Sequence, residues 1–564
     1  MSDPDSKKSK KDWNAMFYLA GENNLADECV FALKELRRAR PRSKDNRHTI
    51  AMDEAADARV KVVAQLDAGG LGGDEVRYIL TRNSEDEDGE LENAADERVD
   101  TTQTNYRGVL RDFISSSIVE KEGHAKHYLL VLSGHGNGLI SDFLSRDTDS
   151  PDYLSIPKIR WVLQEVKQDV IKEFTKENVK DFKIDILGLD SCMMSMAEIG
   201  YELRDYVKYM VAAEGFEPNS GWPYERILSA LLTDSDTIEP EEFAVRIVDR
   251  YVNYYTDFLP AARSVDLSAC DLSKCEDLGE AIKELADAMC VRISNLDDAD
   301  AAIAAANKET LRQIVLAHWE AQSYKDDQYV DLYDFCDLLD RGWKEDPDPK
   351  KTETGSVVMR GVEVADDIRN ACSKIKNILT SNGKNGKKNG GNSYGDKMIL
   401  KSRHSGPAVQ YSHGLSVYFP WANVIESYGD LEFAKNTHWK QFLDQYVEVT
   451  RRRRRPCPAD MEEVRVETGN LFFNPVTASF DFISSENKNA PTVNKVLGNK
   501  VGGMKNPPLD HVVCKYPEKE KAPDGASDQK DESSKSGDSK DSGKTNTGTA
   551  EKRAAPRKRG LRKK

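Results

Sequence analysis

The chain has 564 residues, of which 38% are hydrophobic and 32% charged, a composition typical of a globular protein with polar additions and long enough for more than one domain. Its 81 Lys and Arg residues are outnumbered by 97 Asp and Glu residues, and the net charge of -16 argues against general affinity of the whole chain for nucleic acid. Nowhere do about 18 apolar residues follow one another, so the sequence predicts no transmembrane helix.

Short apolar runs that end at turn-forming residues recur through the first half of the chain. With the loops that follow them, the predicted strands are residues 14–20, 60–70, 75–80, 127–138, 183–194 and 206–215. The second and third of these are expected to pair as a hairpin. The predicted helices between the strands are roughly residues 102–120, 156–174 and 197–206. This alternation indicates an α/β fold whose mainly parallel sheet is covered on both faces.

The second half of the chain is expected to be mostly helical from about residue 270 to 345. A flexible loop is predicted at 383–397, and strands within 408–421 are expected to return to the body. The last helix of this part carries aspartates that we expect on a solvated outer face rather than in a metal site: Asp331, Asp334 and Asp337.

Changes in composition divide the chain into five segments. Residues 1–11 are predicted to be a disordered tail, 12–268 the α/β core, and 269–450 a helical and β continuation of the same unit. Residues 451–514 begin with five arginines and contain a small β addition. Residues 515–564 are too polar to fold and are predicted to be disordered. This tail ends in a basic cluster, which is either solvated or a contact surface for nucleic acid or another acidic partner.

Cysteine and histidine spacing gives no sign of a disulfide framework or a zinc site. The nine cysteines are scattered, and no apolar leader follows the charged first residues, so we expect reduced thiols and a cytoplasmic location. His124 and His127 lack the accompanying ligands of a zinc pattern. No loop of the DxDxDG type occurs. We therefore assign no metal and no required cofactor, and calcium dependence stays open.

Two predicted strands run into loops that carry groups suited to nucleophilic catalysis, SGHGNG with His135 and DSCMM with Cys192. Both loops follow strand ends, where ligand sites of parallel sheets gather. A cysteine needs a neighbour that favours its thiolate and protonates the leaving amine, and a histidine, which titrates near pH ~6.5, suits that task. The backbone N–H groups of Gly136 and Cys192 are candidates for an oxyanion hole.

Each of these residues also has an ordinary explanation when taken singly. A cysteine at a strand end commonly packs as a small apolar residue, and a histidine between glycines is commonly a turn residue. The joint placement of His135 and Cys192 beyond two strands favours the catalytic interpretation.

The sequence resembles the clostripain-like family of cysteine peptidases, relatives of caspases, legumains, gingipains and separases. The matching stretches occur in the family's order and cover roughly residues 12–450: WNAMFYLAGENNL, VVAQLDAGG, LLVLSGHGNG, ILGLDSCMMSMAEIGYEL, VAAEGFEPNSGWPYERIL and HGLSVYFPW. The resemblance implies a caspase-like α/β/α sandwich, a dyad of His135 and Cys192, and cleavage after Arg or Lys.

The resemblance also implies residues that bind the substrate. The family associates an acidic residue two positions before the nucleophile, here Asp190, with the pocket for the basic side chain, and a carboxylate pairs well with a guanidinium. The alternative for Asp190 is a turn cap that accepts backbone N–H bonds. Glu214, Glu217 and Trp222 are candidates for the pocket wall. Their alternative is an ordinary surface loop with Trp222 as a packing anchor.

Members of the family are often activated by self-cleavage between the histidine and the cysteine. Arg146, Lys158 and Arg160 are basic candidates here, with simple surface charge as the alternative. Many relatives carry a secretion signal, which we do not see in this sequence, and the resemblance leaves residues 451–564 unexplained. An intracellular protease of this kind would be expected to act on a specific partner.

The sequence thus predicts a cysteine endopeptidase that cleaves after Arg or Lys through an acyl-enzyme. One alternative is a catalytically silent caspase-like scaffold that binds a protein or nucleic-acid partner through its basic tail. Another is thiol-dependent hydrolysis of a non-peptide amide.

Overall fold

The structure is a computed structural model. The chain forms two compact units in it. The first unit comprises residues 1–456 and 465–512, and the second comprises residues 457–464 and 513–564. The residues that the structure describes are 10–21, 23–41, 59–67, 75–79, 97–99, 106–120, 123–139, 154–174, 179–257, 264–325, 327–341, 364–380, 396–421, 423–452, 462–474, 479–484 and 509–515.

The core of the first unit is a nine-stranded sheet in the order β11-β8-β7-β6-β5-β1-β2-β3-β4. Its strands are β1 (Lys11–Ala20), β2 (Val60–Asp67), β3 (Glu75–Ile79), β4 (Glu97–Val99), β5 (Ala125–Ser133), β6 (Ile184–Asp190), β7 (Val207–Ala212), β8 (Val265–Asp271) and β11 (Ile399–Ser405). The five central strands, from β2 to β7, run parallel, and the strands outside them are antiparallel. The predicted β2–β3 hairpin and the mainly parallel sheet are confirmed.

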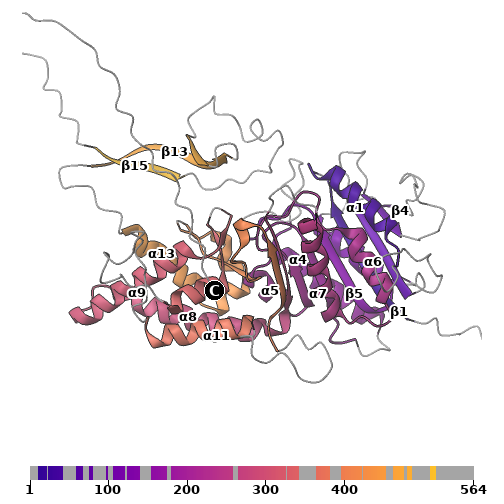
Figure 1. The fold of residues 1–564 in the computed structure, drawn as a ribbon, viewed down its shortest axis with the longest axis horizontal. Coiled ribbons are helices and arrows are strands. Elements are labelled where there is room, and N and C mark those ends of the chain that lie inside the picture. Colours follow the sequence, from indigo (N-terminus) through magenta and orange to yellow (C-terminus); the bar gives the residue numbers. More distant parts are fainter. Residues whose placement is uncertain are drawn as a thin grey trace, which may run out of the picture. The chain divides into compact units, whose positions relative to one another are not determined.

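Helices cover both faces of this sheet, so its central strands are buried on both sides. Alternate side chains of β1 enter different cores: Phe17 and Leu19 face α1 (Ala26–Arg38), α6 (Tyr224–Asp234) and α7 (Pro240–Asp257). Met16 and Tyr18 instead enter the core formed with α3 (Tyr106–Val119), α4 (Ile156–Glu173) and α5 (Ala197–Leu203). Figure 1 shows α1, α6 and α7 against the sheet. The predicted α/β sandwich is therefore confirmed.

A helical layer extends the core that contains Met16 and Tyr18. Its helices are η3 (Leu272–Lys274), α8 (Cys275–Ser294), α9 (Ala301–Glu320), α10 (Leu332–Arg341), α11 (Asp366–Leu379), η5 (Glu426–Asp430), α12 (Glu432–Asn436) and α13 (Trp439–Arg452). α8 contacts α9, α11 and α13, as Figure 1 shows. None of the described helices combines the length and the apolar character needed to cross a lipid bilayer.

A small antiparallel sheet contacts the helical layer and also the loops at the carboxyl ends of the main sheet's strands. It consists of β9 (Ser323–Tyr324), β10 (Tyr329–Asp331) and β12 (Ser416–Tyr418). β12 also forms a parallel bridge to Met196, just before α5. Because β11 completes the main sheet and β12 pairs with β10, residues from the C-terminal half build part of the central fold.

The predicted strands within residues 408–421 are only partly right. β12 covers three of these residues, and a short helical turn, η4 (Pro407–Val409), begins the segment. In the segment predicted to hold a small β addition, β13 (Glu462–Asn474) pairs antiparallel with β14 (Ser479–Ser484), and a further strand, β15, spans Leu509–Lys515. The tails at 1–9 and 516–564 and most of the 383–397 loop lie outside the described residues.

The expectation of a solvated acidic face near α10 is wrong. Asp331 is fully buried and Asp334 nearly so. Asp331 accepts hydrogen bonds from the backbone of His413 (2.5 Å) and of Asp334 (2.7 Å), and Asp337 pairs with Lys376 (3.1 Å). His413 and Lys376 come from segments far away in sequence, so helical periodicity alone placed the three carboxylates on the wrong side.

Candidate active site

The loops that carry His135 and Cys192 meet at one edge of the main sheet. β5 and β6 are parallel neighbours, and their register pairs Ser133 with Asp190 at the carboxyl ends. The backbone N–H of Gly134 donates to the carbonyl oxygen of Asp190 (3.2 Å). His135 and Cys192 each follow the paired residues by two positions. The strand register by itself therefore brings the two loops together.

Gly136 lies directly against the turn that carries the cysteine. A Cβ on Gly136 would lie 2.6 Å from the carbonyl oxygen of Cys192 and 2.7 Å from the Cβ of Ser191. The Ser191 hydroxyl donates to the carbonyl oxygen of Gly134 (2.8 Å) and so ties the two loops together. A residue with a side chain at position 136 would force the loops apart.

The histidine loop is held from both sides. The Nε2 atom of His135 lies 2.5 Å from the Oδ1 atom of Asn24, in the turn after β1. On the other side, the hydroxyl of Tyr329 in β10 donates to the carbonyl oxygen of Asn137 (2.6 Å). Gly138 has φ of 61°, and a Cβ there would lie 2.6 Å from the Tyr329 ring, so this turn requires glycine.

Cys192 is half-buried, and its sulfur accepts a hydrogen bond from the backbone N–H of Glu217 (3.3 Å). Burial raises the pKa of the Cys192 thiol, the Glu217 N–H opposes this change, and the charge of Asp190 raises the pKa further. A thiol with a raised pKa is neutral near pH 7, so to act as a nucleophile it would need a proton acceptor.

The backbone N–H groups of Gly136 and Cys192 have no acceptor in another residue among those that the structure describes, so they could serve an oxyanion. The would-be Cβ of Gly136 lies 3.1 Å from the nitrogen of Cys192, which places the two backbone segments side by side. This is the arrangement that a developing negative charge beside the sulfur would require.

Asp190, two residues before Cys192, is buried, and side-chain hydroxyls hold its carboxylate. The hydroxyls of Ser133 (2.8 Å) and Tyr224 donate to Oδ2. A Cβ on Gly221, whose φ is 62°, would lie 2.8 Å from the same oxygen. Oδ1 has no partner among the described residues. No backbone N–H group of the described residues is therefore seen to hold the carboxylate, as the turn-cap alternative would require.

Glu217 adds a second carboxyl group beside Asp190. Its Oε1 accepts from the indole N–H of Trp222 (3.3 Å), and its buried Oε2 has no donor in the described ranges. Burial, and then the charge of Asp190, raise the pKa of Glu217 well above its usual value. Trp222 itself is buried against Gly188, so it is a packing anchor that also orients Glu217.

Glu214 lies elsewhere. Its side chain is fully buried, and Oε2 accepts from the backbone N–H of Gly414 (2.7 Å). Burial raises the pKa of Glu214 well above its usual value, and the neighbouring charges of Asp331 and Asp266 add to the effect. The acidic residue of this loop that contacts Cys192 is Glu217, not Glu214.

The comparison with protein families identifies the chain. The profile of the Clostripain family, peptidase C11, matches residues 17–446. The chain belongs to the clostripain family. It is a clostripain-family cysteine peptidase, and its substrates are peptides. No curated protein sequence matches it significantly.

Several solved structures are similar to this clostripain-family chain at low identity. A secreted C11 cysteine protease from Bacteroides thetaiotaomicron, in complex with an irreversible peptide inhibitor, is 14% identical, with 76% of this chain and 99% of that chain covered and a TM-score of 0.49. An inactive zymogen C11 protease from Parabacteroides distasonis is 15% identical over 76% of this chain and 99% of that chain, with a TM-score of 0.43. The secreted B. thetaiotaomicron protease iotapain is 13% identical over 76% and 100%, with a TM-score of 0.46.

The candidates for self-cleavage in this clostripain-family peptidase have different surroundings. Arg146 lies outside the described residues. Lys158 and Arg160 belong to the first turns of α4, and Arg160 pairs with Glu202 (3.1 Å) and Glu432. Cleavage after Lys158 or Arg160 would require α4 to unwind, because a peptidase takes its substrate in extended form.

Three residues near the site escaped the sequence analysis of this clostripain-family chain. Asn24 contacts His135, the exposed Phe216 precedes Glu217, and the charge of Lys325 favours the Cys192 thiolate. The sequence could have predicted the place of Asn24, because Asn24 lies in the turn after β1, and β1 is the second neighbour of β5 in the sheet. No local pattern could have predicted the role of Lys325, since it lies in a turn between β9 and β10 in the C-terminal half of the chain.

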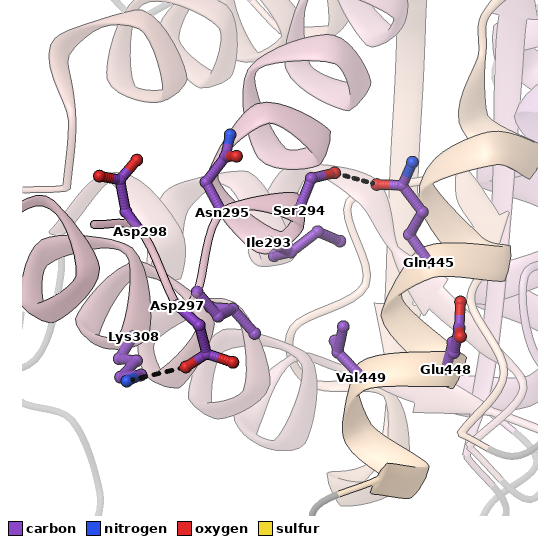
Figure 2. A pocket seen from close by; sticks show the side chains of 10 residues that line it. Ile293, Ser294, Asn295, Asp297, Asp298, Lys308, Gln445, Glu448 and Val449 are labelled. Carbon is purple, nitrogen blue, oxygen red and sulfur yellow. Dashed lines mark hydrogen bonds and ion pairs between the residues drawn. The ribbon is translucent and has the colours of Figure 1, made fainter. Parts of the chain in front are cut away.

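A separate pocket of about 820 Å³ lies between the end of α8, the start of α9 and α13 (Figure 2). Its polar groups are partly paired, by Ser294 with Gln445 (3.1 Å) and by Lys308 with Asp297 (3.2 Å). It shares no residue with the loops of His135 and Cys192. Within the described ranges, no cluster of three or more His, Cys, Asp or Glu side chains could hold a metal ion.

Proposed function

We propose that this clostripain-family peptidase cleaves peptide bonds after Arg or Lys, with Cys192 as nucleophile and His135 as acid and base. The observation that carries the proposal is the direct packing of Gly136, next to His135, on the backbone of Cys192. This contact supports a common site for the sulfur and the imidazole.

In the proposed reaction His135 accepts the proton of the Cys192 thiol, and the thiolate attacks the carbonyl carbon of the scissile bond. The N–H groups of Gly136 and Cys192 stabilise the oxyanion that forms. His135 then protonates the departing amine, and the C–N bond breaks to leave an acyl-enzyme. Finally His135 takes a proton from water, whose oxygen attacks the thioester and releases the acid and the free thiol.

Two carboxyl groups, each with a buried oxygen, support the preference for a basic residue. Asp190 Oδ1 and Glu217 Oε2 have no donor among the described residues, and an unpaired buried acceptor costs about 1–3 kcal/mol. A guanidinium or ammonium group would supply the missing donors and the compensating charge. Burial and the charge of Asp190 raise the pKa of Glu217 well above its usual value, and a cation bound between the two carboxyls would relieve both effects.

A panel of fluorogenic peptides with Arg, Lys or Asp before the scissile bond tests the proposal. Wild-type protein should cleave the Arg and Lys peptides, Cys192→Ala and His135→Ala should not, and Cys290→Ala, a buried cysteine of α8, should behave as wild type. Absence of turnover of every peptide, together with salt-sensitive binding of nucleic acid through the basic tail, would favour the scaffold alternative. Turnover of non-peptide amides alone would favour the third possibility.

The pocket assignment needs its own variants. Asp190→Asn should raise KM for Arg and Lys peptides by about 100-fold, because it removes the charge that a buried guanidinium needs. Asp169→Asn is the matched control, since that carboxylate pairs with Arg111 between α3 and α4, and it should leave KM unchanged. An equal KM for Arg and Asp peptides in the wild type would contradict the pocket.

Activation, cofactors and location are parts of the proposal that rest on the sequence. Self-cleavage between His135 and Cys192 is proposed, with Arg146 as the candidate that does not require α4 to unwind. Mass spectrometry of purified wild type and Cys192→Ala tests it, because only the wild type should be nicked. The chemistry proposed uses no metal or cofactor, and activity after chelation and after added calcium decides the open question of calcium. The cytoplasmic location stays a prediction.

A further inference from the structure

We propose that Asn24 is a positioning residue that orients the His135 ring so that Nδ1, rather than Nε2, exchanges the proton with Cys192. The proposal rests on the role of His135 given above. Its basis is the short contact of 2.5 Å between Asn24 Oδ1 and His135 Nε2.

The chemistry of the two groups assigns the ring proton. The amide Oδ1 only accepts hydrogen bonds, so the Nε2 atom that faces it must carry hydrogen. In the neutral imidazole the other nitrogen, Nδ1, is then the acceptor that can take the thiol proton. When the ring becomes an imidazolium, the bond from Nε2 to Asn24 persists and strengthens. The same contact therefore sets both the tautomer and the ring orientation through the reaction.

The turn after β1 places Asn24 at this spot without using its side chain. The turn is built by its neighbours: Asn23 Oδ1 accepts from the backbone of Leu25 (2.8 Å), and Asn23 Nδ2 donates to Ala20 O (3.1 Å). Gly21 anchors the turn to β2 through Asp67 O (2.7 Å). Asn24 is exposed, and among the described residues the hydrogen bond of its side chain goes to His135.

The strand order explains why this turn reaches the histidine. β1 lies beside β5 in parallel register, with Leu19 paired to Ser133, so the loops that follow both strands leave the same edge of the sheet. The β5 loop thus lies between the turn of β1 on one side and the cysteine turn of β6 on the other. An imidazole on that middle loop can contact Asn24 with one nitrogen and the nucleophile with the other.

The competing explanation is an incidental surface hydrogen bond, which would contribute little to stability and nothing to turnover. The variant Asn24→Ala distinguishes the positioning role from an incidental hydrogen bond. We expect kcat on the best Arg or Lys peptide to fall about 10- to 100-fold with KM within about twofold, because the misoriented ring acts only in the chemical step. Asn24→Asp, which keeps an acceptor at the same position, should recover most of the loss.

The control is Asn295→Ala, which removes another exposed asparagine whose side chain bonds one backbone carbonyl, that of Val291 (2.8 Å). It should leave kcat unchanged. A second readout needs no peptide: the rate at which iodoacetamide alkylates Cys192 should fall in Asn24→Ala in parallel with kcat, at unchanged thermal stability.

Unchanged kcat and unchanged alkylation in Asn24→Ala would overturn the inference, as would a failure of Asn24→Asp to recover activity in a normally folded protein. These outcomes differ from failure of the proposed function. If the wild type cleaves no peptide, the proposed specificity fails, whereas alkylation of Cys192 in the wild type and Asn24→Ala still tests the positioning role.

Discussion

The α-carbon of Gly136 packs so closely against Cys192 that an added methyl group would lie 2.6 Å from the Cys192 carbonyl oxygen. The contact joins two segments more than fifty residues apart in sequence, and it brings the backbone at Gly136 next to the nitrogen of Cys192. Glycine at this position is therefore a steric requirement of the assembled site and not only of a flexible loop.

Gly136→Ala should lower kcat/KM by about 100-fold or more, because the histidine loop must move by the order of 1 Å to relieve the contact. The backbone atoms that clash cannot rotate away as a side chain can. Steady-state kinetics with a basic fluorogenic peptide measures this. Gly429→Ala is the control, since its new Cβ would meet the flexible side chain of Lys440 at 3.3 Å, and it should keep wild-type activity.

Tyr224→Phe should raise KM for Arg peptides by about 10-fold, with a smaller effect on kcat. The change removes the hydroxyl that donates to Asp190 Oδ2 and leaves that oxygen with the Ser133 hydroxyl alone. Tyr251→Phe is a matched control, because the Tyr251 hydroxyl is buried and has no partner in the described part of the chain. If both variants change KM equally, the tyrosine acts through packing and not through Asp190.

Phe216→Ala should raise KM about 5- to 10-fold for peptides that extend with apolar residues on the N-terminal side of the scissile bond. The ring is 60% exposed, and its neighbour Glu217 bonds the Cys192 sulfur, so an extended peptide would cover it. Single-residue Arg substrates should show no change. Phe31→Ala, which removes an exposed ring from α1, should leave both kinds of substrate unaffected.

Glu198→Gln should reduce the dependence of stability on pH. Burial raises the pKa of Glu198 to about 7, although the Tyr418 N–H and the Tyr428 hydroxyl oppose this change. The pKa of this carboxyl is higher in the folded state than in the unfolded state. The stability that the neutral carboxyl contributes is therefore fully present below the unfolded-state pKa, and it is lost as the pH rises to about 7. Raising the pKa from 4.5 to about 7 corresponds to roughly 3 kcal/mol.

Urea denaturation at pH 5 and pH 8 measures this difference. The free energy of unfolding of the wild type should fall between the two values by more than that of Glu198→Gln, with roughly 3 kcal/mol as the order of magnitude of the excess. An identical fall in both proteins would show that Glu198 stays ionised in the folded state.

The sequence was sufficient for the alternation of strands and helices and for the two loops of the site. A buried parallel strand is apolar along its whole length. In residues 127–138 and 183–194 such a strand ends in a loop with glycines, a histidine or a cysteine, so the local sequence was enough to predict both loops. Asp331 and Asp334 were misplaced, because their burial depends on donors near residues 322 and 413 that no local pattern reveals.

What the sequence determined by itself was therefore the family, the α/β class and the two loops that carry His135 and Cys192, since each depends on the order of residues along short segments. Only the tertiary structure decided that Glu217 and not Glu214 meets Cys192, that Trp222 orients Glu217, and that Asn24 contacts His135. These relationships depend on which strands are neighbours in the sheet and on which side chains find donors once water is excluded, and both are properties of the assembled chain.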